Sequence, residues 1–186
     1  MKTTSLTMLS AFAVACLFNS CSSQSYETSR IPVSTSSSAG DSSLAGQILI
    51  NVNSYRKQKG ESELKRHTGL DRLAQQHCEY LSRSSGGDGL KINHNGFGGR
   101  AEKALFYFKI PSIAENVVSS STHSASHVVD LWASSKSHEY NMRSSWTYTG
   151  IGTIVTSDGK LISTQIFGTE EQMETMKKVD PFARFQ

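Results

Sequence analysis

The sequence predicts an α+β fold in which helices pack on a small antiparallel sheet. Apolar residues at helical spacing dominate the first two thirds of the folded part, and one hairpin pattern follows them. A repeated strand-helix-strand unit would alternate these patterns, and neither alternation nor an internal repeat is visible. The chain has 186 residues. About 145 of them remain for a core after the N-terminal region, which suffices for one ordinary domain.

Two helices are expected in the first part of this domain. The first begins at an N-cap formed by Asp41 or Ser42, and Gly60 ends it. The second spans about residues 69–83 and is capped near Thr68. The glycine-rich segment 86–89 that follows must be a loop.

Two further helices are expected before the hairpin. Residues 96–108 form the third, although residues 106–110 are equally compatible with an extended conformation, and Pro111 ends the segment either way. The fourth covers about residues 125–142, because Val128, Val129, Leu131 and Trp132 form an apolar face.

The hairpin closes the domain. Segments 147–155 and 161–167 are rich in β-branched and aromatic residues, and the turn signal Ser157-Asp158-Gly159-Lys160 lies between them, so the two strands pair antiparallel. We place the domain at residues 42–170. The remaining residues 171–186 are a C-terminal tail that begins with a short charged helix.

The N-terminus has the features of an export signal. Lys2 is the only charge before Glu27, and the apolar run 6–18 is too short to span a bilayer. We predict a signal peptide at residues 1–21 with lipid attached to Cys21, which lies at the end of the run. Cys16, preceded by Ala-Val-Ala, is the alternative processing site. Ordinary signal-peptidase cleavage with free secretion is the alternative to a membrane anchor.

Residues 22–41 are dominated by serine and threonine and predict a flexible linker, because they carry too few large apolar residues to form a core. The net charge of +3 gives no reason to expect a nucleic-acid partner. Cys78 is the one cysteine of the folded part, so no intramolecular disulfide is expected there. Its helical spacing with Ala74 and Leu81 predicts a small buried side chain rather than a nucleophile.

Four short segments carry the residue types that support chemistry. In chain order they are His94-Asn95-Gly96-Phe97 with Arg100, Ala114-Glu115-Asn116-Val117, Trp132 to His138 with Asn141, and Gly150-Ile151-Gly152 with residues 164–168. In this order and at these separations they resemble the bacterial SCP-like branch of the CAP superfamily. That superfamily also contains cysteine-rich secretory proteins, antigen 5 and plant pathogenesis-related proteins.

The resemblance implies an α-β-α sandwich with a central cleft. Carried over by motif, the cleft residues are His94, Glu115 and His138, with Asn116 and Ser135 beside them. Two neutral imidazoles and one carboxylate can hold Zn²⁺ or another divalent metal. Without a metal, a glutamate beside a histidine can exchange protons near neutral pH, which makes Glu115 the candidate catalytic residue.

This sequence departs from the family pattern at three places. Ala114 replaces the usual glycine before the glutamate. Ser135 stands where animal and plant members carry a second glutamate, and Trp146 to Tyr148 stand where those members have another histidine. At most three ligands can therefore be named, and a proteolytic role loses support.

These observations lead to three functional hypotheses. The first is a non-catalytic or weakly catalytic cell-envelope protein, exported and anchored to the membrane by lipid, which binds a lipid, an envelope component or a metal in the His/Glu cleft. The second is a metal-assisted hydrolase of an envelope polymer or peptide, and the third is a surface interaction protein with a vestigial cleft. Structural roles are open as well: His94 as a loop-pinning histidine, Glu115 as an acceptor in a turn, and Arg100 as an ion-pair partner.

Overall fold

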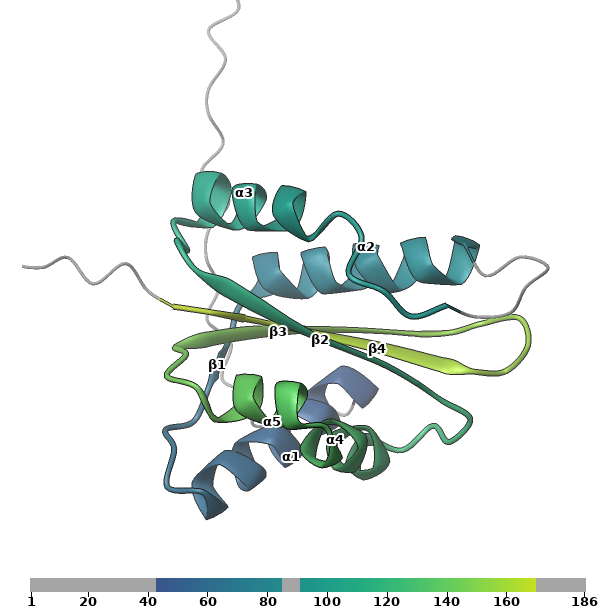
Figure 1. Ribbon diagram of the computed structural model, residues 1–186, viewed down its shortest axis with the longest axis horizontal. Coiled ribbons are helices and arrows are strands. Elements are labelled where there is room, and N and C mark those ends of the chain that lie inside the picture. The colour runs from purple at the N-terminus through teal and green to yellow at the C-terminus, as the bar shows by residue number, and fades with distance from the viewer. Residues whose placement is uncertain (1–42, 85–90, 170–186) are drawn as a thin grey trace, which may run out of the picture. The chain divides into compact units, whose positions relative to one another are not determined.

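Figure 1 shows the computed structural model, which describes residues 43–84 and 91–169. Helices cover both faces of one sheet. On one face lie α2 (Thr68–Ser84) and α3 (Phe97–Phe108). On the other face lie α1 (Leu44–Gln58), α4 (Ala125–Ser134) and α5 (Lys136–Arg143). The expected α-β-α sandwich is confirmed.

The sheet has the strand order β1-β3-β4-β2. Its strands are β1 (Lys65–Arg66), β2 (Ile113–Ser120), β3 (Tyr148–Val155) and β4 (Leu161–Gly168). The predicted antiparallel hairpin of β3 and β4 is confirmed, β2 pairs antiparallel with the other side of β4, and β1 runs parallel to β3. The sequence reasoning did not predict β1 or β2, because β1 has two residues and β2 lacks a simple apolar alternation.

The first two helices begin at other caps than predicted. In α1 the cap is Ser43, whose hydroxyl accepts a hydrogen bond from the backbone N–H of Gly46 at 3.1 Å, and not Asp41 or Ser42. In α2 the cap is His67, whose Nδ1 accepts from the N–H groups of Gly69 and Leu70. Burial lowers the pKa of His67, which favours the neutral imidazole that this cap requires.

The predicted single helix at residues 125–142 is wrong, because the chain breaks it into α4 and α5. Ser135 is extended, with φ −98° and ψ 120°, and it lies between the two helices. Serine side chains compete for backbone groups, and Ser134 donates to the carbonyl of Leu131 at 2.9 Å. The break redirects α5 toward β2, the edge strand next to the candidate site.

The third helix runs to Phe108, so the extended alternative for residues 106–110 is wrong. Lys109 ends it in the left-handed conformation at φ 58°. The predictions for residues 1–41, for the loop at 86–89 and for the tail at 171–186 fall outside the described residues. The proposed domain boundaries therefore stay predictions.

The sheet packs its core on both faces. Trp132, Ile48 and Phe167 are fully buried in the core beside α1 and α4. Cys78 is fully buried on the face covered by α2, and burial raises the pKa of its thiol to about 11. Its sulfur lies 3.2 Å from Thr164 Oγ1. The predicted role of Cys78 as a buried, unreactive side chain is confirmed.

The backbone of α2 lies directly on β3. A Cβ atom on Gly150 would lie 2.1 Å from the backbone of Asp71, and one on Gly152 would lie 2.3 Å from the backbone of Gln75. The side chains of Asp71 and Gln75 also accept hydrogen bonds from β3, from the N–H groups of Ile151 at 2.8 Å and Thr153 at 3.0 Å. These groups lie beyond the short β1 strand, so α2 satisfies the open edge of β3.

We predict that replacing Gly150 or Gly152 with alanine lowers the free energy of unfolding by at least about 3 kcal/mol, because backbone rather than a flexible side chain must move. Gly98→Ala is the matched control. Gly98 lies in a helix with open space around it, so that variant should be unchanged or up to about 1 kcal/mol more stable. Urea denaturation measures all three. Equal stabilities of Gly150→Ala and Gly98→Ala would contradict the packing argument.

Candidate functional site

The site is built around Glu115, whose carboxylate is buried. Glu115 lies in β2, and its side chain points to the face covered by α2 and α3. Successive residues of a strand point to opposite faces, so the next residue, Asn116, points toward α5. Asn116 donates to the carbonyl of His138 at 3.0 Å and accepts from Asn141 at 2.9 Å. The predicted neighbours Glu115 and Asn116 therefore serve different layers.

Arg100 holds the Glu115 carboxylate with two hydrogen bonds. Arg100 Nε lies 2.7 Å from Oε2 and Nη2 lies 2.8 Å from Oε1. The carboxylate side chain is 1% exposed and that of Arg100 is 10% exposed, so water barely screens the pair. The remaining guanidinium nitrogen donates to the carbonyl of Asn95 at 2.9 Å. The hypothesis that Arg100 is an ion-pair partner is confirmed.

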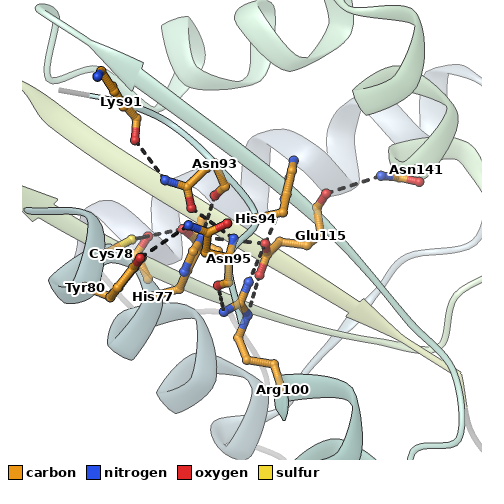
Figure 2. A network of polar contacts seen from close by, with 12 residues as sticks. His77, Cys78, Tyr80, Lys91, Asn93, His94, Asn95, Arg100, Glu115 and Asn141 are labelled. Carbon is orange, nitrogen blue, oxygen red and sulfur yellow. Dashed lines mark hydrogen bonds and ion pairs between the residues drawn. The ribbon is translucent and has the colours of Figure 1, made fainter. Parts of the chain in front are cut away.

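His94 also contacts Glu115. Its Nδ1 lies 2.8 Å from Oε1, while 52% of its side chain is exposed. A carboxylate accepts hydrogen bonds, so Nδ1 of His94 carries a proton and donates to Glu115. Figure 2 shows the side chains of His77, His94 and Arg100 gathered around Glu115. The His94 ring is thus oriented from within the protein while part of it faces solvent.

His77 is a third basic neighbour that the sequence reasoning placed only on the apolar side of its helix. Its Nε2 lies 2.9 Å from the carbonyl of Asn93 and 3.7 Å from Glu115 Oε1. Burial lowers the pKa of His77, and the charge of Glu115 opposes that shift. The ring stacks on Tyr80 with centroids 6.0 Å apart. The sequence did not indicate the contact of His77 with Glu115, because the two residues lie in different elements, α2 and β2.

His138 lies near this group without joining it. Burial lowers the pKa of its imidazole, and the charge of His94 lowers it further. The hydrogen bond of His138 to the site is made by its backbone carbonyl, to Asn116. Ser135 pairs with Ser137 at 3.3 Å. The structure therefore brings His94 and Glu115 into contact, places His138 beside them, and leaves Ser135 in the link between α4 and α5.

The residues do not fit the metal site that two histidines and a glutamate suggest. Both Glu115 oxygens accept from Arg100, and one also contacts His94, so the carboxylate has little remaining capacity for a cation. Within residues 43–84 and 91–169, no group of three or more His, Cys, Asp or Glu side chains is arranged to hold a metal ion. A positively charged guanidinium next to the site also opposes a divalent cation.

A pocket of about 310 Å³ adjoins this group, between α2 and α3. Its lining includes Arg100 from the charged group and several residues that the sequence reasoning missed. It is lined by Leu73, Gln76, His77, Tyr80, Asn95, Gly96, Gly99, Arg100 and Lys103. Gln76 and Tyr80 are exposed on the polar side of α2. The sequence did not indicate that they line a pocket, because nothing in the pattern of α2 shows that α3 lies beside this side of it.

A family model identifies the family to which this chain belongs. The model of the cysteine-rich secretory protein family, CAP, matches residues 49–167. The chain belongs to this family. The CAP match starts in α1 and ends in β4, so it covers all the elements that build the site. A search of curated protein sequences found no significant match.

Solved structures with a similar fold come from three bacteria. An outer surface protein from Borrelia burgdorferi has a TM-score of 0.57 and 20% identity, over 67% of this chain and 90% of that one. A cysteine-rich secretory protein from Staphylococcus aureus has a TM-score of 0.53 and 19% identity over 68% of this chain. An extracellular protein containing an SCP domain, from Bacillus anthracis, has a TM-score of 0.57 and 17% identity, also over 68% of this chain. The match spans 38% and 40% of those two longer chains. At these identities the likeness shows the fold.

The departures of this CAP domain from the family pattern have simple structural consequences. Ala114 lies inside β2, where ordinary extended backbone does not require glycine. Trp146, at the point of the missing histidine, stacks on Phe167 and donates from its indole to the carbonyl of Asn141 at 2.9 Å. Trp146 thus packs against the core cluster beside α1 and α4. No helix within the described ranges is long and apolar enough to cross a membrane.

We predict that Glu115→Gln lowers the free energy of unfolding by about 3–5 kcal/mol, because it leaves the buried Arg100 charge without an anion. The control is Glu79→Gln, which removes one partner of an exposed pair with Arg83 at 3.9 Å and should change stability by less than about 0.5 kcal/mol. Urea denaturation at pH 7 measures both. A Glu115→Gln effect as small as the control would refute a structural role for this carboxylate.

Proposed function

We propose that the chain is an exported, lipid-anchored protein of the cell envelope whose CAP domain binds a polar envelope component at His94 and the adjoining pocket, without catalysis. One observation carries the non-catalytic part. Glu115 is buried and both its oxygens are engaged, so it orients His94 rather than accepting a proton from a substrate. Glu115 itself could act on a substrate only if its carboxylate were free, and within the described residues no group of side chains is arranged to hold a metal ion that would supply a water nucleophile.

The binding part is supported by what the pocket offers to a ligand. Tyr80 presents an aromatic ring that is 39% exposed, Gln76 and Asn95 present amides, and Lys103 presents a positive charge with no ion-pair partner among the described residues. Rings, amides and a cation together suit a ligand with hydroxyl, amide and anionic groups. Cell-wall polymers and lipid headgroups contain these groups.

The metal-assisted hydrolase is the weaker alternative. One observation favours it: His94 is oriented by a carboxylate and partly exposed, which is the arrangement of a histidine general base. A hydrolase would also need a nucleophile or a metal-bound water. The Arg100 guanidinium occupies the carboxylate face on which a cation would bind.

We predict that the purified full chain binds isolated peptidoglycan or vesicles of extracted envelope lipid. The substitution His94→Ala or Lys103→Ala should weaken this binding at least about tenfold, because each removes about one charge-assisted hydrogen bond. His127→Ala, on α4 in the opposite layer, is the matched control and should bind like the original chain. Cosedimentation measures the affinity. In a Cys21→Ser background, which removes the proposed anchor, binding that is equal in all variants would rule out this site.

The same proteins separate binding from metal-assisted hydrolysis. A ligand that binds the native state raises the melting temperature. If His94 and His138 do not bind Zn²⁺, the melting temperatures of the original chain, His94→Ala and His138→Ala should respond equally to Zn²⁺. We expect this result. Release of soluble fragments from peptidoglycan by the original chain, lost in His94→Ala, would support the hydrolase instead.

Anchoring at Cys21 is supported by the export signal and by the family, whose description names secretory proteins.

We predict that cells expressing the full chain incorporate labelled palmitate into it, that Cys21→Ser abolishes the label and that Cys16→Ser retains it. Gel fluorography of the purified protein is the measurement. A label lost only in Cys16→Ser would move the anchor to that residue, and no label in the original chain would favour free secretion.

A further inference from the structure

Three consecutive large apolar side chains are exposed at the C-terminal end of α3. The exposed fractions are 53% for Leu105, 70% for Phe106 and 68% for Tyr107. We call these three residues the α3 tip. Helix α3 lies beside α2 on the same face of the sheet (Figure 1).

The tip is held firmly although it is exposed. Ala104, just before it, is fully buried, and Phe108, just after it, packs its ring on Gly69 and 5.2 Å from the His67 ring centroid. A Cβ on Gly69 would lie 2.5 Å from the Phe108 ring, so the contact is close. Both ends of the tip are therefore fixed to α2, and its exposure does not come from fraying.

Helix geometry explains why the three side chains of the tip stay exposed in the part of the chain that the structure describes. Successive helical residues point about 100° apart, so three in a row cannot all face α2. A run of three exposed apolar residues is unfavourable in water unless another surface covers it. The amphipathic spacing of α3 would be met equally well by polar residues at these positions.

Positive charge borders the tip. Lys109 lies with Nζ 5.7 Å from the centre of the Phe106 ring, and Lys103 is one turn before Tyr107. Glu102 is the acidic residue of the same helix, one turn before Phe106, so lysines exceed it on this surface. Long lysine side chains beside aromatic rings place their charge at headgroup level while the rings lie deeper.

We propose that the α3 tip inserts into the headgroup region of a lipid bilayer that contains anionic lipid. The basic border complements the negative surface of such a bilayer. The tip is convex and comes from one helix. A deformable bilayer accepts a convex apolar surface without a matching groove, whereas a protein partner must supply one. The proposal rests neither on ligand binding nor on acylation.

The first test places a tryptophan at the tip of the full chain. In Phe106→Trp, with vesicles of phosphatidylcholine and phosphatidylglycerol that carry brominated acyl chains, the new tryptophan should shift its emission to the blue and be quenched. The matched control is Tyr140→Trp, since Tyr140 is 72% exposed but lies on α5 in the opposite layer. Trp132 and Trp146 are common to both variants.

We expect quenching to be several-fold stronger at position 106 than at position 140. This comparison reports which surface meets the lipid, whether or not another part of the chain also holds the protein on the vesicle. Equal quenching at the two positions would overturn the proposal. A blue shift at position 106 that grows with protein concentration without vesicles would also overturn it, because a second copy would then cover the tip.

The second test removes the apolar side chains. In a Cys21→Ser background, which removes the proposed anchor, Phe106→Ser combined with Tyr107→Ser should lower the partition of the chain into these vesicles about tenfold or more. This is the effect expected when one or two large apolar side chains no longer enter the bilayer. Tyr140→Ser should leave partition unchanged. Both substitutions lie at exposed positions, so melting temperatures should stay within a few degrees of the original chain. Unchanged partition of the double variant would contradict insertion.

Discussion

The structure depends on the contact between the backbone of α2 and the backbone of β3. Only hydrogen atoms at Gly150 and Gly152 separate the two elements, and Asp71 and Gln75 bind the strand edge from the helix. This contact leaves α2 little freedom to slide or rotate. Every group that α2 contributes to the site, His77 above all, is therefore fixed relative to the sheet.

The charged group adds a second constraint, which links α3 to the same sheet. A carboxylate that is 1% exposed is stable only if its hydrogen bonds are satisfied, and here Arg100 of α3 supplies two of them. The pairing holds α3 beside β2 and at the same time orients His94. Stability and site geometry thus come from one group, which explains why a residue chosen for its chemistry turns out to have a structural function.

The sequence predicted what local patterns determine and missed what tertiary contacts determine. The hairpin followed from β-branched strands around a Ser-Asp-Gly turn, and His94 and Glu115 were named from their motifs. The capping side chain of α2 was missed because it is an imidazole. The break at Ser135 was missed because the polar residues around it do not interrupt the helical spacing. Strand β2 was missed because Glu115 and Asn116 are polar and yet buried. The engagement of Glu115 by Arg100 could not be read from residues that are 15 positions apart in different elements.

The two surfaces proposed for binding lie on the same helix. The pocket uses the N-terminal half of α3, from Gly96 to Lys103, and the tip uses its C-terminal half. A helix rises about 1.5 Å per residue, so Gly99 and Phe106 are separated by about 10 Å along its axis. A tip in the headgroup region would hold the pocket close to the bilayer surface. Of the ligands proposed for the pocket, a lipid headgroup would gain most from this placement, because lipid headgroups are concentrated at the bilayer surface.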